Sequence, residues 1–229
     1  MTVREIGTYE ILERFSAAAD PVKAQPMKAY MRDQFEFLGI PKPQRALLSR
    51  EFLNQAGRSA RIRGSEGIDW DFVDLCWEKP QREFQYLAIS YLMKFKQVIV
   101  PSDLPKIQQL IVTKSWWDTV DALDLLVGAI ALRHKEMNEI LLIWSRDDNI
   151  WLRRTAIDHQ LDRKADTDAE LLATIIIANL GQTEFFINKA IGWSLREYSK
   201  TNPDWVRTFI NEHREKMASL SIREASKYL

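Results

Sequence analysis

Apolar residues recur at helical spacing along almost the whole chain, and the alternating pattern of a β-strand is missing. Asp20-Pro21, Ser102-Asp103 and Asp147–Asn149 resemble helix N-caps, and Pro80 and Pro203 suit the first turn of a helix. The pattern therefore predicts an all-α protein. The predicted helices span residues 5–18, 22–37, 43–56, 69–77, 80–95, 103–113, 117–133, 136–144, 149–161, 168–179, 183–199, 203–211 and 221–228.

A 34-residue period runs through this helical pattern. Alanine followed by a larger aliphatic residue recurs in four successive segments, and an apolar residue follows each pair by one helical turn. Two helices in a repeat of about this length are typical of an α-solenoid of the HEAT, armadillo or TPR kind, and a helical bundle with coincidental spacing is the alternative. A solenoid curves, and its concave face is a natural binding groove. The repeated residues are Ala88-Ile89 with Met93, Ala122-Leu123 with Val127, Ala156-Ile157 with Leu161, and Ala190-Ile191 with Leu195.

The segment Gly57–Gly67 is the only long polar stretch with several glycines, and it predicts a loop. We expect this loop to separate an N-terminal helical cap, residues 1–56, from the helical repeats, residues 68–229. The chain of 229 residues is long enough to bury a sizeable core. We therefore expect a single domain made of the cap and the repeats.

Composition and charge narrow the classes of function. Hydrophobic residues make up 46% of the chain, which excludes a disordered protein. The 32 Lys and Arg residues balance the 32 Asp and Glu residues, and this neutrality argues against nonspecific binding of nucleic acid over the whole surface. A basic excess of five nevertheless lies in Asp20–Gly64, and an acidic excess of four follows in Glu66–Ser90. Any DNA binding must therefore use basic residues gathered on one face.

The sequence gives no sign of a membrane segment or a metal site. Leu171–Thr183 is the longest run without a charge, and its thirteen residues are too few to span a bilayer. The single Cys76 excludes an intrachain disulfide and a multi-cysteine zinc site, and it suits a reducing cytosol. His134, His159 and His213 lack the spacing of metal ligands. We expect a cytoplasmic protein with no metal and no cofactor.

A tryptophan and an aspartate form the first candidate site. Trp117 and Asp121 lie one helical turn apart and share a face, whereas Trp116 and Val120 fall on the neighbouring core face. This arrangement places an aromatic ring beside a carboxylate, away from the most apolar stripe. A half-buried tryptophan next to a solvated aspartate is the structural alternative.

Arg154 is unusual because it interrupts an apolar stripe that includes Ile150 and Ile157. An arginine in such a place needs a partner. Asp158, one helical turn further on, is one candidate. A phosphate is the other, because the guanidinium fork can bind it through two hydrogen bonds.

Three cations and a tryptophan share one face of the last predicted repeat. Lys189, Trp193, Arg196 and Lys200 recur at alternating spacings of four and three residues. Basic residues interleaved with an aromatic residue suit a sugar-phosphate backbone, with charge on phosphate and the ring on sugar or base. Cation–π packing of Trp193 against its own neighbours is the alternative.

Several ordered motifs carry a resemblance to a known family. They are Met27–Met31 (MKAYM), Phe37–Ile40 (FLGI), Val112–Asp121 (VTKSWWDTVD), Asp148–Leu152 (DNIWL) and Glu184–Tyr198 (EFFINKAIGWSLREY). With these motifs the chain resembles, from about residue 21 to its end, the bacterial DNA alkylation repair family of HEAT-like-repeat alkylpurine DNA glycosylases. The resemblance implies hydrolysis of the N-glycosidic bond of cationic 3- or 7-alkylated purines in duplex DNA, without a metal. The product is an abasic site, as in base excision repair.

The resemblance also implies roles for individual residues. By their positions in the motifs, Asp121 matches the catalytic aspartate, Trp117 and Trp193 match tryptophans that face the sugar, and Arg154 matches a phosphate-binding arginine. Tyr30 matches a position near the lesion strand. The family holds the backbone of the lesion while the base stays stacked, which differs from base flipping.

The resemblance implies that alkylated duplex DNA is the partner of a monomeric protein in the bacterial cytosol, associated with the nucleoid when on DNA. Some relatives resemble binders of branched or distorted DNA and lack the catalytic residues, which are present in this chain. Two alternatives to a glycosylase therefore stay open. One is a noncatalytic, structure-specific DNA-binding protein, and the other is a HEAT-type scaffold that binds other proteins.

Overall fold

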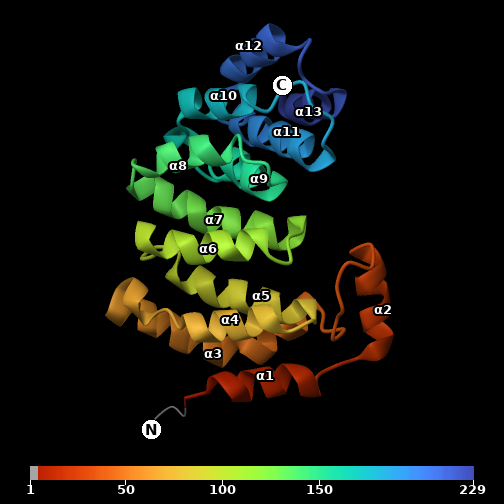
Figure 1. The fold of residues 1–229 in the computed structure, drawn as a ribbon, viewed down its shortest axis with the longest axis vertical. Coiled ribbons are helices and arrows are strands. Elements are labelled where there is room, and N and C mark those ends of the chain that lie inside the picture. The colour runs from red at the N-terminus through yellow and green to blue at the C-terminus, as the bar shows by residue number, and fades with distance from the viewer. Residues whose placement is uncertain (1–4) are drawn as a thin grey trace. The chain divides into compact units, whose positions relative to one another are not determined.

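The computed structural model describes residues Glu5 to Leu229, and this part of the chain is all-α (Figure 1). It forms thirteen α-helices, and its only β-type pairing is an isolated bridge between Glu36 and Gln81. The predicted fold class is confirmed. No helix among the described residues is both long enough and apolar enough to cross a membrane. The chain divides into two compact units, the first ending at Ile99 and the second spanning Val100–Leu229.

The first unit is built around a long central helix, α3. This helix packs against α1 and α5, and α4 packs against α5. The core between these helices is largely aromatic: the rings of Phe52, Phe72, Tyr91 and Phe95 follow one another at centroid distances of 4.8, 5.0 and 5.2 Å. The helices are α1 (Thr8–Ala17), α2 (Pro21–Tyr30), α3 (Lys42–Arg63), α4 (Trp70–Glu78) and α5 (Arg82–Leu92).

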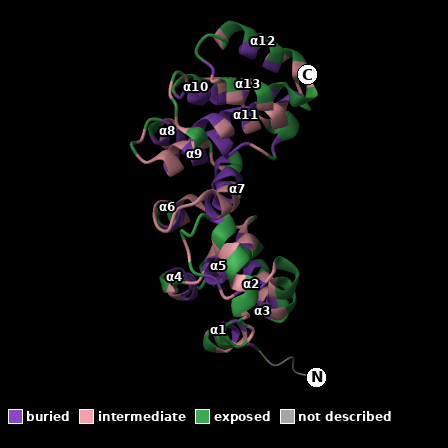
Figure 2. Ribbon diagram, turned by 90° about the vertical axis from the view of Figure 1, so that its right-hand side faces the viewer, coloured by how far each residue is buried: buried purple, intermediate pink, exposed green. Residues whose placement is uncertain are grey.

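Helix α2 is held through its ends, because none of its residues is buried (Figure 2). The Asp20 side chain caps its first turn by accepting from the amides of Val22 and Lys23. After the helix, the backbone at Leu38–Ile40 is anchored by the buried Glu83, whose carboxylate accepts three amide hydrogen bonds of 2.8 to 3.0 Å. A buried carboxylate with three donors is well satisfied and fixes the loop that follows α2.

Two sequence predictions in this unit are wrong in their bounds. The helix expected over 22–37 ends at Tyr30, and the loop expected at Gly57–Gly67 is helical for more than half its length, because α3 continues to Arg63. Buried Ala56 and Ala60 keep one face of α3 against the core while its polar residues face outward. The helix stops where Gly64 takes a positive φ of 60°. The division into a cap and repeats stays a prediction.

The second unit consists of helix pairs stacked in two layers. In one layer, α7, α9, α11 and α13 pack on one another in that order, and α6, α8, α10 and α12 flank them. This arrangement is an α-solenoid of helical repeats, as the 34-residue period predicted. The helices are α6 (Leu104–Val112), α7 (Trp117–Arg133), α8 (Met137–Trp144), α9 (Ile150–Asp158), α10 (Ala169–Ile177), α11 (Phe185–Ser199), α12 (Pro203–His213) and α13 (Ser219–Ala225).

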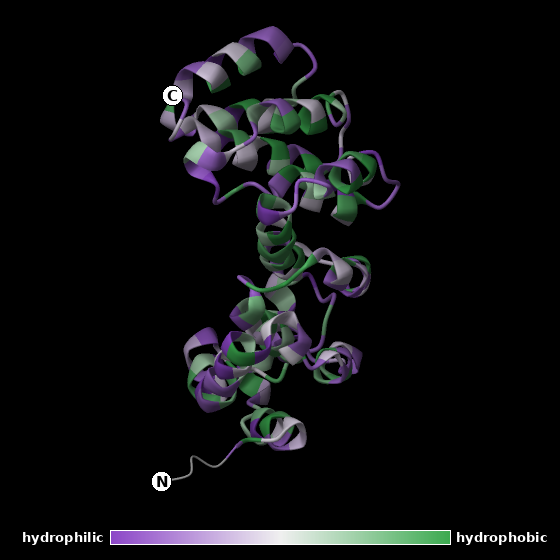
Figure 3. Ribbon diagram, turned by 90° about the vertical axis from the view of Figure 1, so that its left-hand side faces the viewer, coloured by the Kyte–Doolittle hydropathy of each residue, from purple (hydrophilic) through white to green (hydrophobic). Residues whose placement is uncertain are grey.

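Most of the repeated apolar residues lie at equivalent, buried places in this stack, whereas Ala122 and Leu161 are only partly buried. Leu123 of α7, Ile157 of α9 and Ile191 of α11 are completely inaccessible to solvent, as are the alanines before the last two. Figure 3 shows hydrophobic segments along the helix sides that face neighbours within a unit. The small alanine lets adjacent helices approach, and the aliphatic residue fills the space between them.

Gly128 permits a close contact between α7 and the end of α9. A Cβ atom at this position would lie 2.1 Å from the backbone carbonyl oxygen of His159. The Gly128 carbonyl in turn accepts a hydrogen bond of 3.1 Å from Arg163. Because the clashing atom belongs to the backbone, no side-chain movement can make room. The distance between α7 and α9, which carry the candidate site, therefore depends on this glycine.

We predict that Gly128→Ala lowers the free energy of unfolding by about 1–3 kcal/mol, the usual cost of overpacking a core. Alanine is the better helix former by roughly 1 kcal/mol, so any net loss reports the clash alone. Gly57→Ala in α3 is the matched control, since the nearest atom to its Cβ would be a lysine carbon at 4.0 Å. Urea denaturation should show stabilisation by Gly57→Ala and destabilisation by Gly128→Ala. Equal shifts in both variants would contradict the packing argument.

Candidate functional site

Three aromatic rings hold the first turns of α7, α9 and α11 together. Trp116, at the N-cap of α7, lies 5.9 Å from the ring of Trp151 and 5.1 Å from that of Phe186. Trp151 and Phe186 lie 5.0 Å apart and belong to the first turns of α9 and α11. Aromatic contacts of this kind stabilise by about 0.5–1.5 kcal/mol each beyond their buried area. They fix the register of the three helices, and residues one turn further along therefore face one another.

An ion pair between Asp121 and Arg154 lies at the centre of this region. The Arg154 Nε donates to Asp121 Oδ1 over 2.8 Å, which joins α9 to α7. Its Nη1 donates over 2.7 Å to the backbone carbonyl of Phe186 at the start of α11. The Arg154 side chain is only 2% exposed and that of Asp121 is 19% exposed. The guanidinium is therefore buried among three helices, while the carboxylate reaches the surface.

Two further aspartates surround the guanidinium. Asp158 Oδ2 lies 3.6 Å from Arg154 Nη2, and Asp158 Oδ1 accepts a 2.9 Å hydrogen bond from the hydroxyl of Ser194 on α11. Asp124 Oδ1 accepts a 2.6 Å hydrogen bond from the hydroxyl of Thr155. Both aspartates are buried, and the second carboxylate oxygen of each receives no hydrogen bond. Three carboxylates thus share a single buried guanidinium.

Burial and the neighbouring charges shift the pKa values of the groups in this cluster. Burial raises the pKa of Asp158 to about 6, although the nearby Arg154 lowers it. Burial raises the pKa of Asp124 well above its ordinary value, and the charges of Asp158 and Asp121 raise it further. Burial also raises the pKa of Asp121, and the hydrogen bond from Arg154 offsets part of this rise. Arg154 stays charged, because the carboxylates outweigh the effect of burial on its pKa. Burial and the excess negative charge of the cluster thus both favour protonation of Asp124.

Asp121, Asp124 and Asp158 lie close enough together to suggest a cation site, but their surroundings do not fit one. One oxygen from each of Asp121, Asp124 and Asp158 lies within 4.8 Å of the others. The Arg154 guanidinium, 2.8 Å from Asp121, already supplies the positive charge that such a group attracts. A divalent cation would also require a deprotonated Asp124, which burial opposes. The three carboxylates therefore suit the Arg154 guanidinium that they already surround better than they suit a metal ion.

The two tryptophans expected at the sugar lie on the helices that bear this cluster. Trp117 begins α7, one turn before Asp121, and its side chain is half-buried. Trp193 is a half-buried residue of α11 directly before Ser194, whose hydroxyl binds Asp158. The guanidinium carbon of Arg196 lies 5.6 Å from the Trp193 ring centroid, so the cation–π contact considered from the sequence is present.

The three expected DNA-binding cations on α11 all have acidic partners. Lys189 Nζ lies 2.8 Å and Arg196 Nη1 lies 3.1 Å from the carboxylate of Glu224 on α13. Lys200 Nζ lies 2.6 Å from Glu197, one turn before it. The face is therefore less positive than its basic residues alone suggested, although these cations remain partly accessible to solvent.

Tyr30 belongs to the first unit, at the end of α2. It is 71% exposed and borders an open, mostly apolar hollow of about 330 Å³. Arg45 and Tyr86 also line this hollow, and the guanidinium carbon of Arg45 lies 4.5 Å from the ring centroid of Tyr86. An exposed tyrosine beside an arginine suits contact with a nucleic-acid strand.

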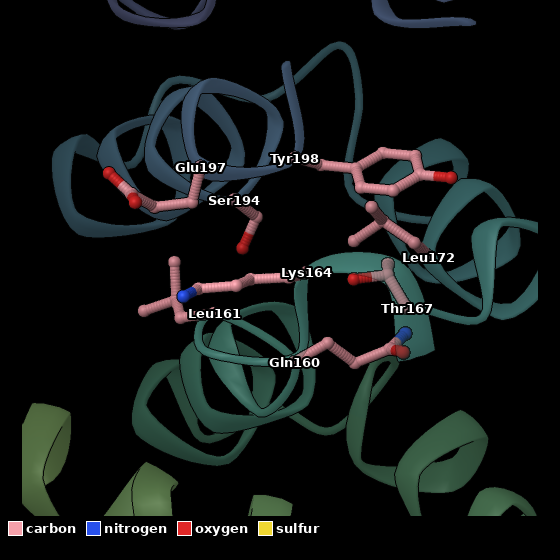
Figure 4. A pocket seen from close by; sticks show the side chains of 8 residues that line it. All are labelled: Gln160, Leu161, Lys164, Thr167, Leu172, Ser194, Glu197 and Tyr198. Carbon is pink, nitrogen blue, oxygen red and sulfur yellow. The ribbon is translucent and has the colours of Figure 1, made fainter. Parts of the chain in front are cut away.

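A small cavity lies beside Ser194 of α11 (Figure 4). Its lining comes from α11, from Leu172 of α10 and from the segment after α9. The volume open to the centre of a water molecule is about 10 Å³. Such a space holds about one water molecule, so it offers no site for a base or a sugar. This cavity is therefore not a candidate site for the chemistry.

Some residues of the site escaped the sequence analysis, although the 34-residue period contained a signal for them. Asp124 and Asp158 are one period apart, which places them on adjacent helices of the stack. Trp116, Trp151 and Phe186 follow one another at 35-residue steps. The sequence offered Asp158, within the same helix, as a partner of Arg154, whereas the hydrogen bonds of Arg154 go to Asp121 and to the Phe186 carbonyl, 33 and 32 residues away. Residues about one period apart are neighbours in a solenoid.

Comparisons with known proteins agree with this architecture. A family model described as DNA alkylation repair enzyme matches residues 11–229. A solved structure described as a predicted DNA alkylation repair enzyme from Enterococcus faecalis is 36% identical to the chain, with a TM-score of 0.82. That match covers 92% of this chain and 96% of the other. None of the curated proteins compared with the chain matches it. Because the family model spans nearly the whole sequence, the chain belongs to the DNA alkylation repair enzyme family.

Proposed function

We propose that the protein is a monofunctional DNA glycosylase that hydrolyses the N-glycosidic bond of cationic 3- or 7-alkylated purines in duplex DNA. Membership in a DNA alkylation repair family implies DNA as the partner and repair as the role. The finer assignment rests on one observation: the carboxylate of Asp121, 19% exposed, is held by a buried arginine between two helices that carry tryptophans. The product is an abasic site for base excision repair. We further propose that the protein acts as a cytosolic monomer.

The proposed reaction needs a negatively charged group near the sugar and does not need a general acid. A cationic alkylpurine leaves as a neutral base, so its departure needs no proton. Positive charge develops instead on the deoxyribose, and the Asp121 carboxylate stabilises it electrostatically. The indole faces of Trp117 and Trp193 flank the sugar and add cation–π stabilisation. Asp121 also orients the attacking water, which supplies the hydroxyl of the abasic product.

Arg154 takes a different role in this proposal from the phosphate contact that the family resemblance implies. Its guanidinium is 2% exposed and directs hydrogen bonds at Asp121 and at the Phe186 carbonyl. We assign it to keeping Asp121 ionised and correctly oriented. Phosphate contacts fall instead to the more accessible Lys189 and Lys200, with Arg196, and in the first unit to the strand-contacting Tyr30.

Two alternative functions would give results in one experiment that differ from those of a glycosylase. A noncatalytic binder of distorted DNA would bind duplexes without releasing a base, and a protein-binding scaffold would do neither. Base release from a duplex with one defined 7-alkylguanine, measured beside a DNA-binding titration, separates all three. We expect both release and binding.

We predict that Asp121→Asn lowers the single-turnover rate of alkylpurine release by roughly a hundred- to thousandfold, about 3–4 kcal/mol. Asparagine is nearly isosteric and its oxygen can still accept from Arg154, so folding and DNA affinity should persist. Asp118→Asn removes the same charge from the first turn of α7 and is the matched control. It should change the rate by no more than a few-fold. A wild-type rate in Asp121→Asn would refute the catalytic assignment.

Metal removal gives a second test. Because an arginine occupies the cationic place among Asp121, Asp124 and Asp158, EDTA should leave the rate of base release unchanged. The measurement is single-turnover release in excess EDTA and again after addition of Mg²⁺ or Mn²⁺. Activity that is lost in EDTA and restored by a divalent ion would show that the three aspartates bind a metal.

The rate should also fall as the solution becomes acidic. Only the ionised Asp121 stabilises the sugar cation, and burial raises its pKa, so protonation begins at a higher pH than for an exposed aspartate. Asp158, with a pKa of about 6, titrates with it, and the decline belongs to the coupled cluster. We expect single-turnover release to be constant above neutrality and to fall below about pH 6. A rate that stays constant down to pH 4.5 would show that the carboxylate charge is not required.

A further inference from the structure

Glu224 of α13 bridges the two cations that flank Trp193 on α11. Its Oε1 lies 2.8 Å from Lys189 Nζ and its Oε2 lies 3.1 Å from Arg196 Nη1. The Glu224 side chain is 16% exposed, and Arg196 in turn lies over the Trp193 ring. One carboxylate from a neighbouring helix thus sets the positions of three side chains on the candidate DNA face.

The backbone around Glu224 is shaped for this contact. A Cβ atom at Gly192 would lie 2.6 Å from Glu224 Cβ and 3.1 Å from the carbonyl oxygen of Ser221. The buried Ser221 hydroxyl also donates over 2.7 Å to the carbonyl of Asn188 on α11. Glycine at the position before Trp193 therefore lets α13 lie directly on α11. This close packing of the two helices brings the Glu224 carboxylate within reach of the cations on α11.

Glu224 has an electrostatic cost for a protein that binds DNA. Lys189, Arg196 and Lys200 bring three positive charges, and Glu197 and Glu224 leave a net charge of +1. A carboxylate here repels phosphate and weakens binding to any duplex. Because these ion pairs lower the affinity for DNA, we look for their role in how the cations are oriented. A cation held in one orientation loses less side-chain entropy when it meets its target.

We infer that Glu224 is a positioning residue: it holds Lys189 and Arg196 where they bind the phosphates beside a lesion, and so places the charged sugar of the lesion against the Trp193 ring. The inference rests on the proposed function. Each cation keeps further N–H donors for a phosphate after bonding Glu224, because a lysine has three and an arginine five. Glu224 therefore need not leave when DNA binds.

The experiment separates charge from position by comparing Glu224→Gln with Glu197→Gln. Both variants remove one negative charge from the same face, but Glu197 lies on α11 itself and does not bridge to α13. Affinity for undamaged duplex should rise by about two- to fivefold in both. Only Glu224→Gln should lower the single-turnover rate of base release, by roughly tenfold or more.

A second readout does not require turnover. A duplex carrying a cationic pyrrolidine in place of one deoxyribose mimics the charged sugar, and the measured quantity is its affinity relative to undamaged duplex. Glu224→Gln should lose about tenfold in this preference, whereas Glu197→Gln should keep it. Glu224→Asp, which retains the charge but shortens the side chain, should bind undamaged duplex like the wild type and also lose preference. It serves as the second variant if the glutamine substitution disturbs folding.

The outcomes for the two proposals are distinct. Wild-type protein that releases no alkylpurine would overturn the proposed glycosylase, and the preference for the pyrrolidine duplex would still decide the role of Glu224. A wild type without that preference, or a Glu224→Gln variant that matches Glu197→Gln in preference and rate, would overturn the inference.

Discussion

The second unit depends on one buried guanidinium. Arg154 donates to a carboxylate of α7 and to a backbone carbonyl of α11, and it lies beside the carboxylate of Asp158 in its own helix. A buried charge is tolerable only when it is paired and hydrogen-bonded, and removing one partner of such a pair typically costs about 3–5 kcal/mol. The three central helices must therefore keep their spacing and register for the charge to be satisfied. The same contacts orient Asp121, so the packing of the core also determines the geometry of the candidate site.

This dependence explains why small and aromatic residues lie where they do. Gly128 lets α7 approach the end of α9, and Gly192 lets α13 approach α11. Trp116, Trp151 and Phe186 then set the level of the first turns. Close approach alone would allow the helices to slide, and aromatic contacts alone would allow them to separate. Together they leave few arrangements in which hydrogen bonds near 2.8 Å can form across helices.

The sequence was sufficient for the helical class and for the repeat, because both depend on local spacing of apolar residues. It was insufficient where the answer depended on which residues face each other across helices. Arg154 has a suitable acid in its own helix, yet its hydrogen bonds go to Asp121 in the preceding repeat and to the Phe186 carbonyl in the following one. The cations of α11 looked unpaired because Glu224 lies beyond another helix and two connections. Gly57–Gly67 resembled a loop by composition, but packing of Ala56 and Ala60 keeps most of it helical.

The candidate site combines a partly accessible carboxylate with a buried guanidinium, and this arrangement has a chemical consequence. An aspartate surrounded by apolar helices would take up a proton and lose its charge, as burial favours for Asp124. An aspartate free in water would keep its charge, but water would screen it from a neighbouring sugar. Asp121 avoids both limits, because Arg154 stabilises the carboxylate from the protein side while little solvent reaches it. In the proposed reaction, the Asp121 carboxylate is thus held in place before the substrate arrives. Preorganised charge of this kind stabilises a developing cation without the cost of reorienting solvent during the reaction.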